Sequence, residues 1–313
     1  MKKSISAFSV GKIILMGEHS VVYGRPALSI PFPAARVKTS INEIEGKARF
    51  SCYFYEGRLE DAPEKLLGIT SMIEKILESF NERPENIEII IESTVPQERG
   101  MGSSAAVSVS VIRALYKYYG REISLEDQIK WSDFSEKWIH GNPSGLDAAT
   151  IVGNKSLYFI KGKAFKSFDN KLDAYLVVGD SGLLGQTREA VTDVRKLVDK
   201  NPEKYMALID ELGSLADQAK INIEANRPKE LGANMLKAHK LLRQLTVSND
   251  SLDSLVEAAL EAGAWGAKLT GGGRGGSMIA LCKDEKQAKE VSLALKEKGA
   301  IETWIARLGE DND

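Results

Sequence analysis

The sequence predicts an α+β fold of about two domains. Strand-like segments dominate the first third, helical patterns fill residues 188–262, and strands return near the end. Strands and helices therefore occur in groups and do not alternate regularly, as they would in a doubly wound sheet. With 313 residues, 43% of them hydrophobic, each domain is long enough to bury its own core. We expect a boundary between residues 170 and 185, and hence domains at 1–175 and 176–313.

The first third is predicted to consist of strands with one helix. Its strand-like segments are short and either apolar or alternating, and prolines separate several of them. The helix is predicted where apolar residues recur at every third or fourth position. The strands are expected at Ser6–Val10, Lys12–Met16, Ala34–Glu43, Ala48–Tyr55 and Asn86–Ser93, and the helix at Pro63–Phe80.

Two helices and a tight connector are predicted next. Ser104–Tyr119 is apolar on nearly every side, which indicates a buried helix. A second helix is expected at Ser124–His140, beginning with a capping box. The segment GNPSGLD, residues 141–147, contains a proline and two glycines and is predicted to be a turn without helix.

The rest of the chain is predicted to hold a hairpin, a helical region and a final group of strands. Residues 188–262 have a helical pattern that polar or proline-containing breaks near residues 201, 227 and 249 divide into several helices. The expected elements around them are a hairpin near Leu157–Phe165, strands at Ala174–Val178, Gly266–Leu269, Ser277–Leu281 and Glu302–Leu308, and a helix at Glu285–Lys298.

Charge and composition narrow the class of protein. The formal net charge is −2, so no excess of positive charge points to nucleic acid or to an anionic membrane. No apolar run reaches the ~18 residues of a membrane span, and Gly11 and Lys12 interrupt the N-terminal segment before it resembles a signal peptide. Cys52 and Cys282 lie far apart; a disulfide between them is left open, although reduced thiols are more typical of such a pair. We expect a cytoplasmic protein.

The segment PQERGMGSSAA, Pro96–Ala106, is the first candidate site. Gly100 and Gly102 permit left-handed backbone angles and a close approach to a ligand. Ser103 and Ser104 follow at the start of the buried helix, where free N–H groups and the helix dipole favour a phosphate. A capped helix after a turn is the alternative interpretation.

Two other phosphate-binding motifs do not fit this segment. The dinucleotide fingerprint requires a second strand that ends in an acidic residue about 20 positions further on. Residues 120–127 predict a turn and a helix start instead. The pattern GxxxxGK[ST] is absent from the sequence.

A second glycine-rich loop, Gly271–Gly276, separates two short apolar strands. An over-long hairpin turn is one interpretation. Five glycines around Arg274 carry a high cost in backbone entropy. We therefore favour a loop whose backbone approaches a ligand and whose arginine supplies charge.

Two carboxylates and a lysine are candidates for the chemistry. Asp147 ends the predicted connector, and Glu136 lies on the preceding helix. Because the chain folds back at Pro143, both are expected to face one cleft, one as a Mg²⁺ ligand and one as a base. A solvated Glu136 is the alternative. Lys12 is flanked by apolar residues at a strand start, where a lysine requires a carboxylate or phosphate partner.

The three histidines differ in their surroundings. Glu18 and His19 lie in a loop between glycines and are suited to grip a small polar molecule; a histidine that caps its own loop is the alternative. His140 and His239 have no partners at metal-binding spacing and are expected to be structural.

Three ordered motifs resemble those of the GHMP kinase superfamily. They are GKIILMGEHSVVYG from Gly11, PQERGMGSSAA from Pro96 and KLTGGGRGGS from Lys268, and they span almost the whole chain. The first of them, together with HGNPSGLDAAT, is most similar to the mevalonate kinase family. The resemblance implies an N-terminal domain like ribosomal protein S5 domain 2 and a C-terminal ferredoxin-like domain.

The resemblance also implies an activity and its site. The ATP γ-phosphoryl group would pass, with Mg²⁺, to the C5 hydroxyl of (R)-mevalonate in isoprenoid biosynthesis, and relatives suggest a homodimer. Asp147 would be the base with Lys12 beside it, and Ser104 and Glu136 would hold Mg²⁺. Glu18, His19, Thr187 and Gly272 would complete the mevalonate pocket, and the ATP-binding residues would be Pro96, Arg99, Gly100, Met101, Gly102, Ser103, Ser104, Ala105 and Ala106.

Two alternative functions remain beside that of a mevalonate-phosphorylating enzyme. One is another GHMP enzyme that acts on phosphomevalonate or diphosphomevalonate, whose phosphates require extra cations; the first motif supplies only Lys12 and Arg25. The other is a non-catalytic metabolite sensor on the same fold. Such a sensor would have lost the acid or the lysine, but Lys12, Glu136 and Asp147 are all present.

Overall fold

The chain folds into two compact units that are interleaved in sequence. A computed structural model describes residues 3–140 and 145–309. The long strands β1 (Ser4–Met16) and β2 (Ala27–Lys47) each contribute one part to either unit. The first unit comprises Met1–Gly11, Ala35–Pro96 and Gly102–Gly153, and the second Lys12–Ala34, Gln97–Met101 and Asn154–Asp313. The predicted division of the sequence between residues 175 and 176 stays a prediction.

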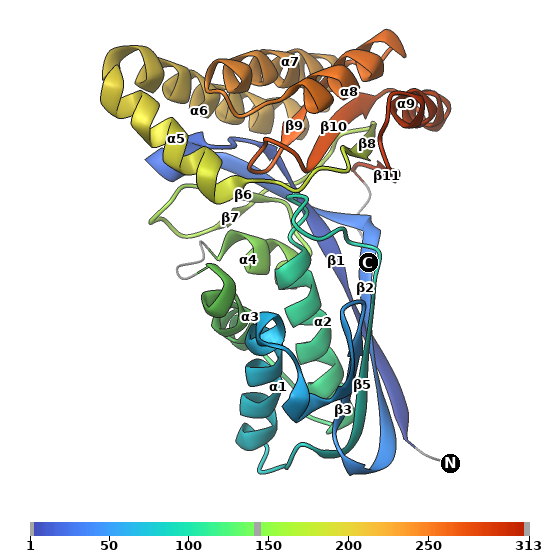
Figure 1. Cartoon of the computed structure of the whole chain (residues 1–313). Helices are drawn as coiled ribbons and strands as arrows, with labels where there is room; N and C mark the ends of the chain where they lie inside the picture. Colours follow the sequence, from blue (N-terminus) through green and yellow to red (C-terminus); the bar gives the residue numbers. More distant parts are fainter. Residues whose placement is uncertain (1–2, 141–144, 310–313) are drawn as a thin grey trace. The chain divides into compact units, whose positions relative to one another are not determined.

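The first unit places a layer of helices against a sheet. Its central strand β5 pairs antiparallel with the second part of β2 and parallel with β3, which forms a hairpin with β4. The helices lie on one side of these strands, and α2 contacts the other three (Figure 1). The elements are β3 (Arg49–Cys52), β4 (Tyr55–Arg58), β5 (Glu85–Ser93), α1 (Leu67–Ser79), α2 (Ser103–Tyr118), α3 (Leu125–His140) and α4 (Leu146–Gly153), with short 3-10 turns η2 (Leu59–Asp61) and η3 (Glu64–Leu66).

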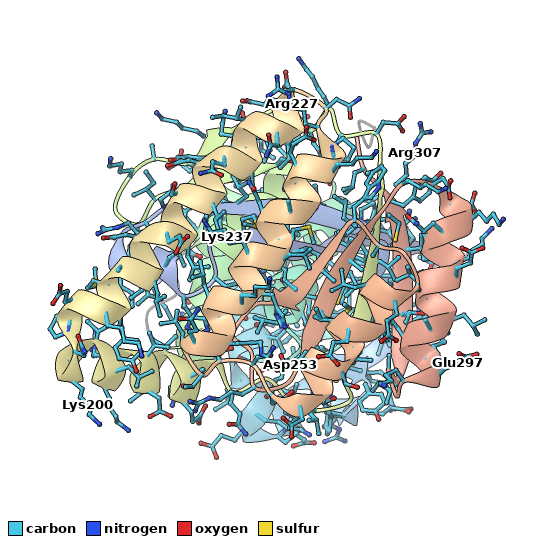
Figure 2. The ribbon with its side chains drawn as sticks, turned by 90° about the horizontal axis from the view of Figure 1, so that it is seen from above. Lys200, Arg227, Lys237, Asp253, Glu297 and Arg307 are labelled. Carbon is cyan, nitrogen blue, oxygen red and sulfur yellow. The ribbon has the colours of Figure 1, made fainter. Side chains whose placement is uncertain are left out.

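The second unit is built on a four-stranded antiparallel sheet in the order β11-β8-β10-β9. Every residue of β10 is buried, because strands flank it on both edges and helices α8 and α9 contact it. Figure 2 looks onto the helices that cover this sheet. The elements are η1 (Ser20–Tyr23), β6 (Leu157–Phe159), β7 (Lys166–Ser167), β8 (Tyr175–Asp180), α5 (Thr187–Lys200), α6 (Pro202–Glu224), α7 (Pro228–Gln244), α8 (Asp250–Glu261), β9 (Gly266–Thr270), β10 (Ser277–Cys282), α9 (Glu285–Glu297) and β11 (Glu302–Arg307).

Most predicted elements in the second half are confirmed. The helical region divides where expected, since Asn201 caps α6 with Pro202 at its first position and Asn249 caps α8. The strand, glycine loop, strand, helix and strand of the tail are all present. The buried helix after the first glycine loop is confirmed as α2, and the predicted hairpin is confirmed as β6 and β7.

Four predictions in the first half are wrong. The single strand expected at Ala48–Tyr55 is a hairpin, because a turn at residues 53–54 separates β3 from β4. The two strands expected at Ser6–Val10 and Lys12–Met16 are one strand, β1, because a glycine between them can stay extended. The strand expected from Ala34 begins much earlier, at the start of β2. Its prolines lie between the stretch that pairs with β6 and the stretch that pairs with β5, so they interrupt neither ladder.

The fourth correction concerns the connector predicted at residues 141–147. Leu146 and Asp147 are the first two residues of helix α4 and do not belong to a connecting loop. Residues 141–144 of the predicted connector, with Pro143, lie outside the described residues. None of the helices in the described part of the chain combines the length and hydropathy needed to span a bilayer.

Candidate active site

The N-terminus of α2 carries no side-chain cap. The helix begins at Ser103, and its N-cap is Gly102, which has a positive φ of 69° and no side chain. Ser103 donates its hydroxyl to the carbonyl of Val95 at 3.4 Å and not to the helix. The alternative of a side-chain-capped helix is therefore wrong for the described residues. The first N–H groups of α2 and the positive end of its dipole suit an anion such as phosphate.

Three oxygen-bearing side chains come from helices that pack together in the first unit. Ser104 is half-buried in the first turn of α2, Glu136 is 8% exposed near the end of α3, and Asp147 is half-buried in the first turn of α4. Helix α3 contacts both α2 and α4. The alternative of a solvated Glu136 is wrong, because its side chain is buried. A hydroxyl and a carboxylate are donors that Mg²⁺ prefers.

An ion pair between Glu18 and Lys268, called here the buried ion pair, lies in the second unit. Both side chains are 0% exposed. The ammonium of Lys268 donates to Glu18 Oε1 and, at 2.8 Å, to the carbonyl of Leu269. Burial raises the pKa of Glu18 above its ordinary value, although the charge of Lys268 works against that shift. The other oxygen of Glu18, Oε2, is buried and has no hydrogen-bond partner among the described residues.

His19 offers a second unpartnered acceptor beside Glu18. Its Nε2 lies 2.9 Å from the carbonyl oxygen of Gly272. A carbonyl only accepts, so Nε2 carries the proton and Nδ1 is left as an acceptor in the neutral ring. Burial lowers the pKa of His19 to about 4, so the ring is neutral at pH 7. Nδ1 is buried without a partner in the part of the chain that the structure describes. The alternative of a loop-capping histidine is wrong, since the side chain makes no cap hydrogen bond to η1.

The second glycine loop, Gly271–Gly276, joins β9 to β10 and packs tightly within the second unit. A Cβ on Gly272 would lie 2.1 Å from Thr187 Oγ1, and one on Gly273 would lie 2.0 Å from the carbonyl oxygen of Val247. Gly272 and Gly273 are therefore required by protein packing. Arg274 donates to Asp193 at 2.7 Å and to the carbonyl of Thr246 at 3.2 Å. Its guanidinium thus forms an ion pair with α5, and the predicted contribution of its charge to a ligand stays a prediction.

The segment Gln97–Met101 of the first glycine loop is held by β8. Arg99 Nε lies 2.9 Å from Asp180 Oδ1, and its Nη2 donates to the carbonyl of Gly182 at 3.1 Å. The Arg99 and Asp180 side chains are only 11% and 3% exposed. The predicted contact of Arg99 with ATP stays a prediction. The ion pair with Asp180 shows how this part of the loop is anchored.

The predicted site residues divide between the two units. Lys12, Glu18, His19, Thr187 and Gly272 belong to the second, where the charge of Lys12 also reaches Glu18 and lowers its pKa in part. Ser104, Glu136 and Asp147 belong to the first, together with Pro96 and residues 102–106. The pairing of Lys12 with Asp147 stays a prediction.

Sequence reasoning missed two residues of the site, Lys268 and Asp180. Lys268 lies inside the fully buried strand β9, and a lysine between apolar residues requires a partner. That signal, which singled out Lys12, was equally available for Lys268. His239, which was predicted to be structural, is buried and its Nε2 lies 3.1 Å from Asp253. The side chain of His140 lies outside the described ones.

The neutral state of His19 predicts a pH-dependent contribution to stability. Its pKa in the folded protein, about 4, is below the ordinary value of 6.5, so the unfolded chain binds more protons between these values. The free energy of unfolding should therefore fall as the pH drops from 6.5 to about 4, by about 3 kcal/mol from this residue.

Urea unfolding of the wild type and of His19→Asn between pH 4 and pH 8 checks this expectation. Asparagine tolerates the positive φ of 60° at this position. The difference in unfolding free energy between the two proteins should shrink as the pH falls. A difference that stays constant with pH would contradict the neutral, buried state of His19.

Comparison with known proteins identifies the class to which this fold and site belong. Residues 68–154 match the family described as GHMP kinases N terminal domain, and residues 219–301 match GHMP kinases C terminal. Mevalonate kinase of Thermococcus sibiricus is 36% identical, over 97% of each chain.

Two solved structures agree with that likeness. Mevalonate kinase from methicillin-resistant Staphylococcus aureus MRSA252 is 35% identical with a TM-score of 0.79, covering 98% of this chain and 100% of that one. The L. major mevalonate kinase in complex with R-mevalonate is 26% identical with a TM-score of 0.84, covering 98% and 96%. The chain therefore belongs to the GHMP kinases and, among them, to the mevalonate kinase family.

Proposed function

We propose that the chain transfers the γ-phosphoryl group of ATP to the C5 hydroxyl of (R)-mevalonate, yielding 5-phosphomevalonate and ADP. The family membership supports an ATP-dependent kinase with a small alcohol as acceptor. The observation that carries the acceptor class is a pair of buried acceptor atoms, Glu18 Oε2 and His19 Nδ1, that have no hydrogen-bond partner among the residues the structure describes. A ligand with donor groups, such as hydroxyls, would satisfy both of them.

The proposed residues divide the work of phosphoryl transfer. This reaction depends on positioning and on neutralising negative charge more than on covalent catalysis. The N-terminal N–H groups of α2 would bind the ATP phosphates. Lys12 would stabilise the charge that develops on the attacking oxygen, and Asp147 would take the proton of the hydroxyl as the new P–O bond forms.

Mg²⁺ is part of the proposal. Ser104 and Glu136 would hold it, and when bound it would neutralise phosphate charge. Within residues 3–140 and 145–309, no group of three or more His, Cys, Asp or Glu side chains is placed to hold a metal ion. A small protein ligand set is what Mg²⁺ needs when substrate phosphates supply further oxygens.

The alternative GHMP substrates fit the second unit less well. A phosphate on the acceptor would need free cations, whereas the Lys268 ammonium is bound to Glu18 and the Arg274 guanidinium to Asp193. The two unpartnered atoms at Glu18 and His19 are acceptors and would oppose a phosphate. Following the family resemblance, we also propose a cytoplasmic homodimer that serves isoprenoid biosynthesis.

Product analysis tests this proposal. Purified protein, Mg-ATP and (R)-mevalonate should yield ADP and one phosphomonoester in equal amounts. The formation of both products is measured by ³¹P NMR. Carbon-13 labelling at C5 should show coupling of that carbon to the new phosphorus. Formation of ADP without a phosphomonoester, or a phosphate on another oxygen, would contradict the proposed acceptor.

A further inference from the structure

A chain of hydrogen bonds leads from the surface of the second unit toward the buried ion pair. Asp253, labelled in Figure 2, lies in the first turn of α8. Its carboxylate accepts from Arg243 Nε at 2.8 Å and from the hydroxyl of Ser248. His239 Nε2, on the neighbouring helix α7, lies 3.1 Å from the same carboxylate. Arg243 is 55% exposed and Asp253 18%, so the chain begins at solvent.

His239 continues this chain to the backbone of β9. The residue is 5% exposed, and its Nδ1 accepts the N–H of Leu269 at 3.4 Å. Because Nδ1 is an acceptor, the ring proton is on Nε2 and is donated to Asp253. Burial lowers the pKa of His239 to about 4, which agrees with a neutral ring of this tautomer.

The side chains of His239 and Lys268 both form hydrogen bonds with the backbone of Leu269. Strand β9 is the edge of its sheet, so N–H groups on its outer side need acceptors from outside the sheet. His239 accepts the N–H of Leu269, and Lys268 donates to the C=O of the same residue. Both polar groups of one residue are therefore held by side chains, and one of these side chains belongs to the buried ion pair.

We propose that His239 is a positioning residue for the reaction. Through the backbone of Leu269 it fixes Lys268, and Lys268 in turn fixes the carboxylate of Glu18 for the substrate hydroxyl. The proposal rests on the proposed function of that site, and it assigns a role in substrate binding to a histidine that touches no substrate.

Two variants of similar size separate the two hydrogen bonds of His239. The amide oxygen of His239→Asn takes the position of Nδ1 and can still accept from Leu269. The longer amide of His239→Gln reaches Asp253 instead and leaves the N–H of Leu269 without its acceptor. Loss of one buried hydrogen bond should raise the KM for mevalonate about tenfold in His239→Gln. The Asn variant should stay within about twofold of the wild type, since the bond to Leu269 is kept.

Steady-state kinetics and melting temperatures together distinguish a positioning role of His239 from a purely stabilising one. The kcat and the KM for ATP should change little in either variant, and the order of the mevalonate KM values should not follow the order of the melting temperatures. Equal KM values for the Asn and Gln variants, or a KM for the Gln variant equal to that of the wild type, would overturn the proposal.

A measurement without substrate keeps this inference distinct from the proposed function. The chain has three histidines, so long-range ¹H–¹⁵N spectra of its imidazoles are simple to assign with the His239 variants. At pH 7 the signal of His239 should show a protonated Nε2 and an unprotonated Nδ1. A protonated Nδ1 would overturn the inference. If the wild type fails to phosphorylate mevalonate, the proposed function fails, whatever the tautomer proves to be.

Discussion

Asp147→Asn is expected to lower kcat for mevalonate about 10²- to 10⁴-fold, the range that general-base catalysis contributes. Asparagine keeps the size of the side chain but cannot take the proton of the hydroxyl. Asp147 is half-buried at the start of α4, and asparagine has nearly the same shape as aspartate, so the melting temperature should change little. The KM for ATP should also stay close to that of the wild type. Steady-state ADP release coupled to an indicator reaction gives kcat and KM directly.

Asp250→Asn is the matched control for this variant. Asp250 is an exposed aspartate in the first turn of α8, so the same chemical change occurs in the first turn of another helix. Its kcat should equal that of the wild type. If Asp147→Asn retains full activity, Asp147 is not the base, and an orienting role is also excluded if the KM for mevalonate is unchanged.

Lys268→Met is expected to reduce the free energy of unfolding by about 3–5 kcal/mol, because it leaves the buried carboxyl group of Glu18 without its ion-pair partner. Both side chains of the buried ion pair are 0% exposed, so water cannot replace the lost ammonium. Since the variant also releases the carboxylate that is proposed to bind the substrate hydroxyl, the KM for mevalonate should rise. Urea unfolding and steady-state kinetics measure the two effects separately.

The double variant Glu18→Gln/Lys268→Met separates stability from function. Removing both charges should restore most of the unfolding free energy, because no uncompensated charge remains. Activity should not recover, since the Glu18 carboxylate is gone. As a control, Lys289→Met breaks an exposed pair with Glu285 and should have little effect. A double variant as active as the wild type would contradict the role of the buried ion pair.

The sequence was sufficient for elements whose signal is local. The glycine loop between β9 and β10, the helix α9 and the breaks between α5, α6, α7 and α8 are each marked by residues inside the element or at its ends. β2 was mispredicted because it changes partner along its length, from β6 to β5, and no local period shows such a change. The start of α4 was missed because a proline and glycines precede it.

Part of the candidate site was also predictable, because some of its residues are marked by their neighbours in the sequence. The apolar neighbours of Lys12 and the position of the Glu18–His19 pair between glycines were visible in the sequence. The partner of Glu18 was not, since Lys268 is separated from it by 250 residues and only the tertiary fold brings the two together. The same holds for Arg99 and Asp180, 81 residues apart. The unpartnered atoms of Glu18 and His19, which carry the acceptor class, exist only in three dimensions.

The most direct test of the central claim is the specificity of the enzyme. Coupled ADP release should be measured with Mg-ATP and, in turn, (R)-mevalonate, phosphomevalonate, homoserine and galactose as acceptors. We expect the highest kcat/KM with (R)-mevalonate, because its hydroxyls satisfy the acceptor atoms of Glu18 and His19 and it carries no phosphate. A higher kcat/KM with any of the other three acceptors would contradict the proposed function.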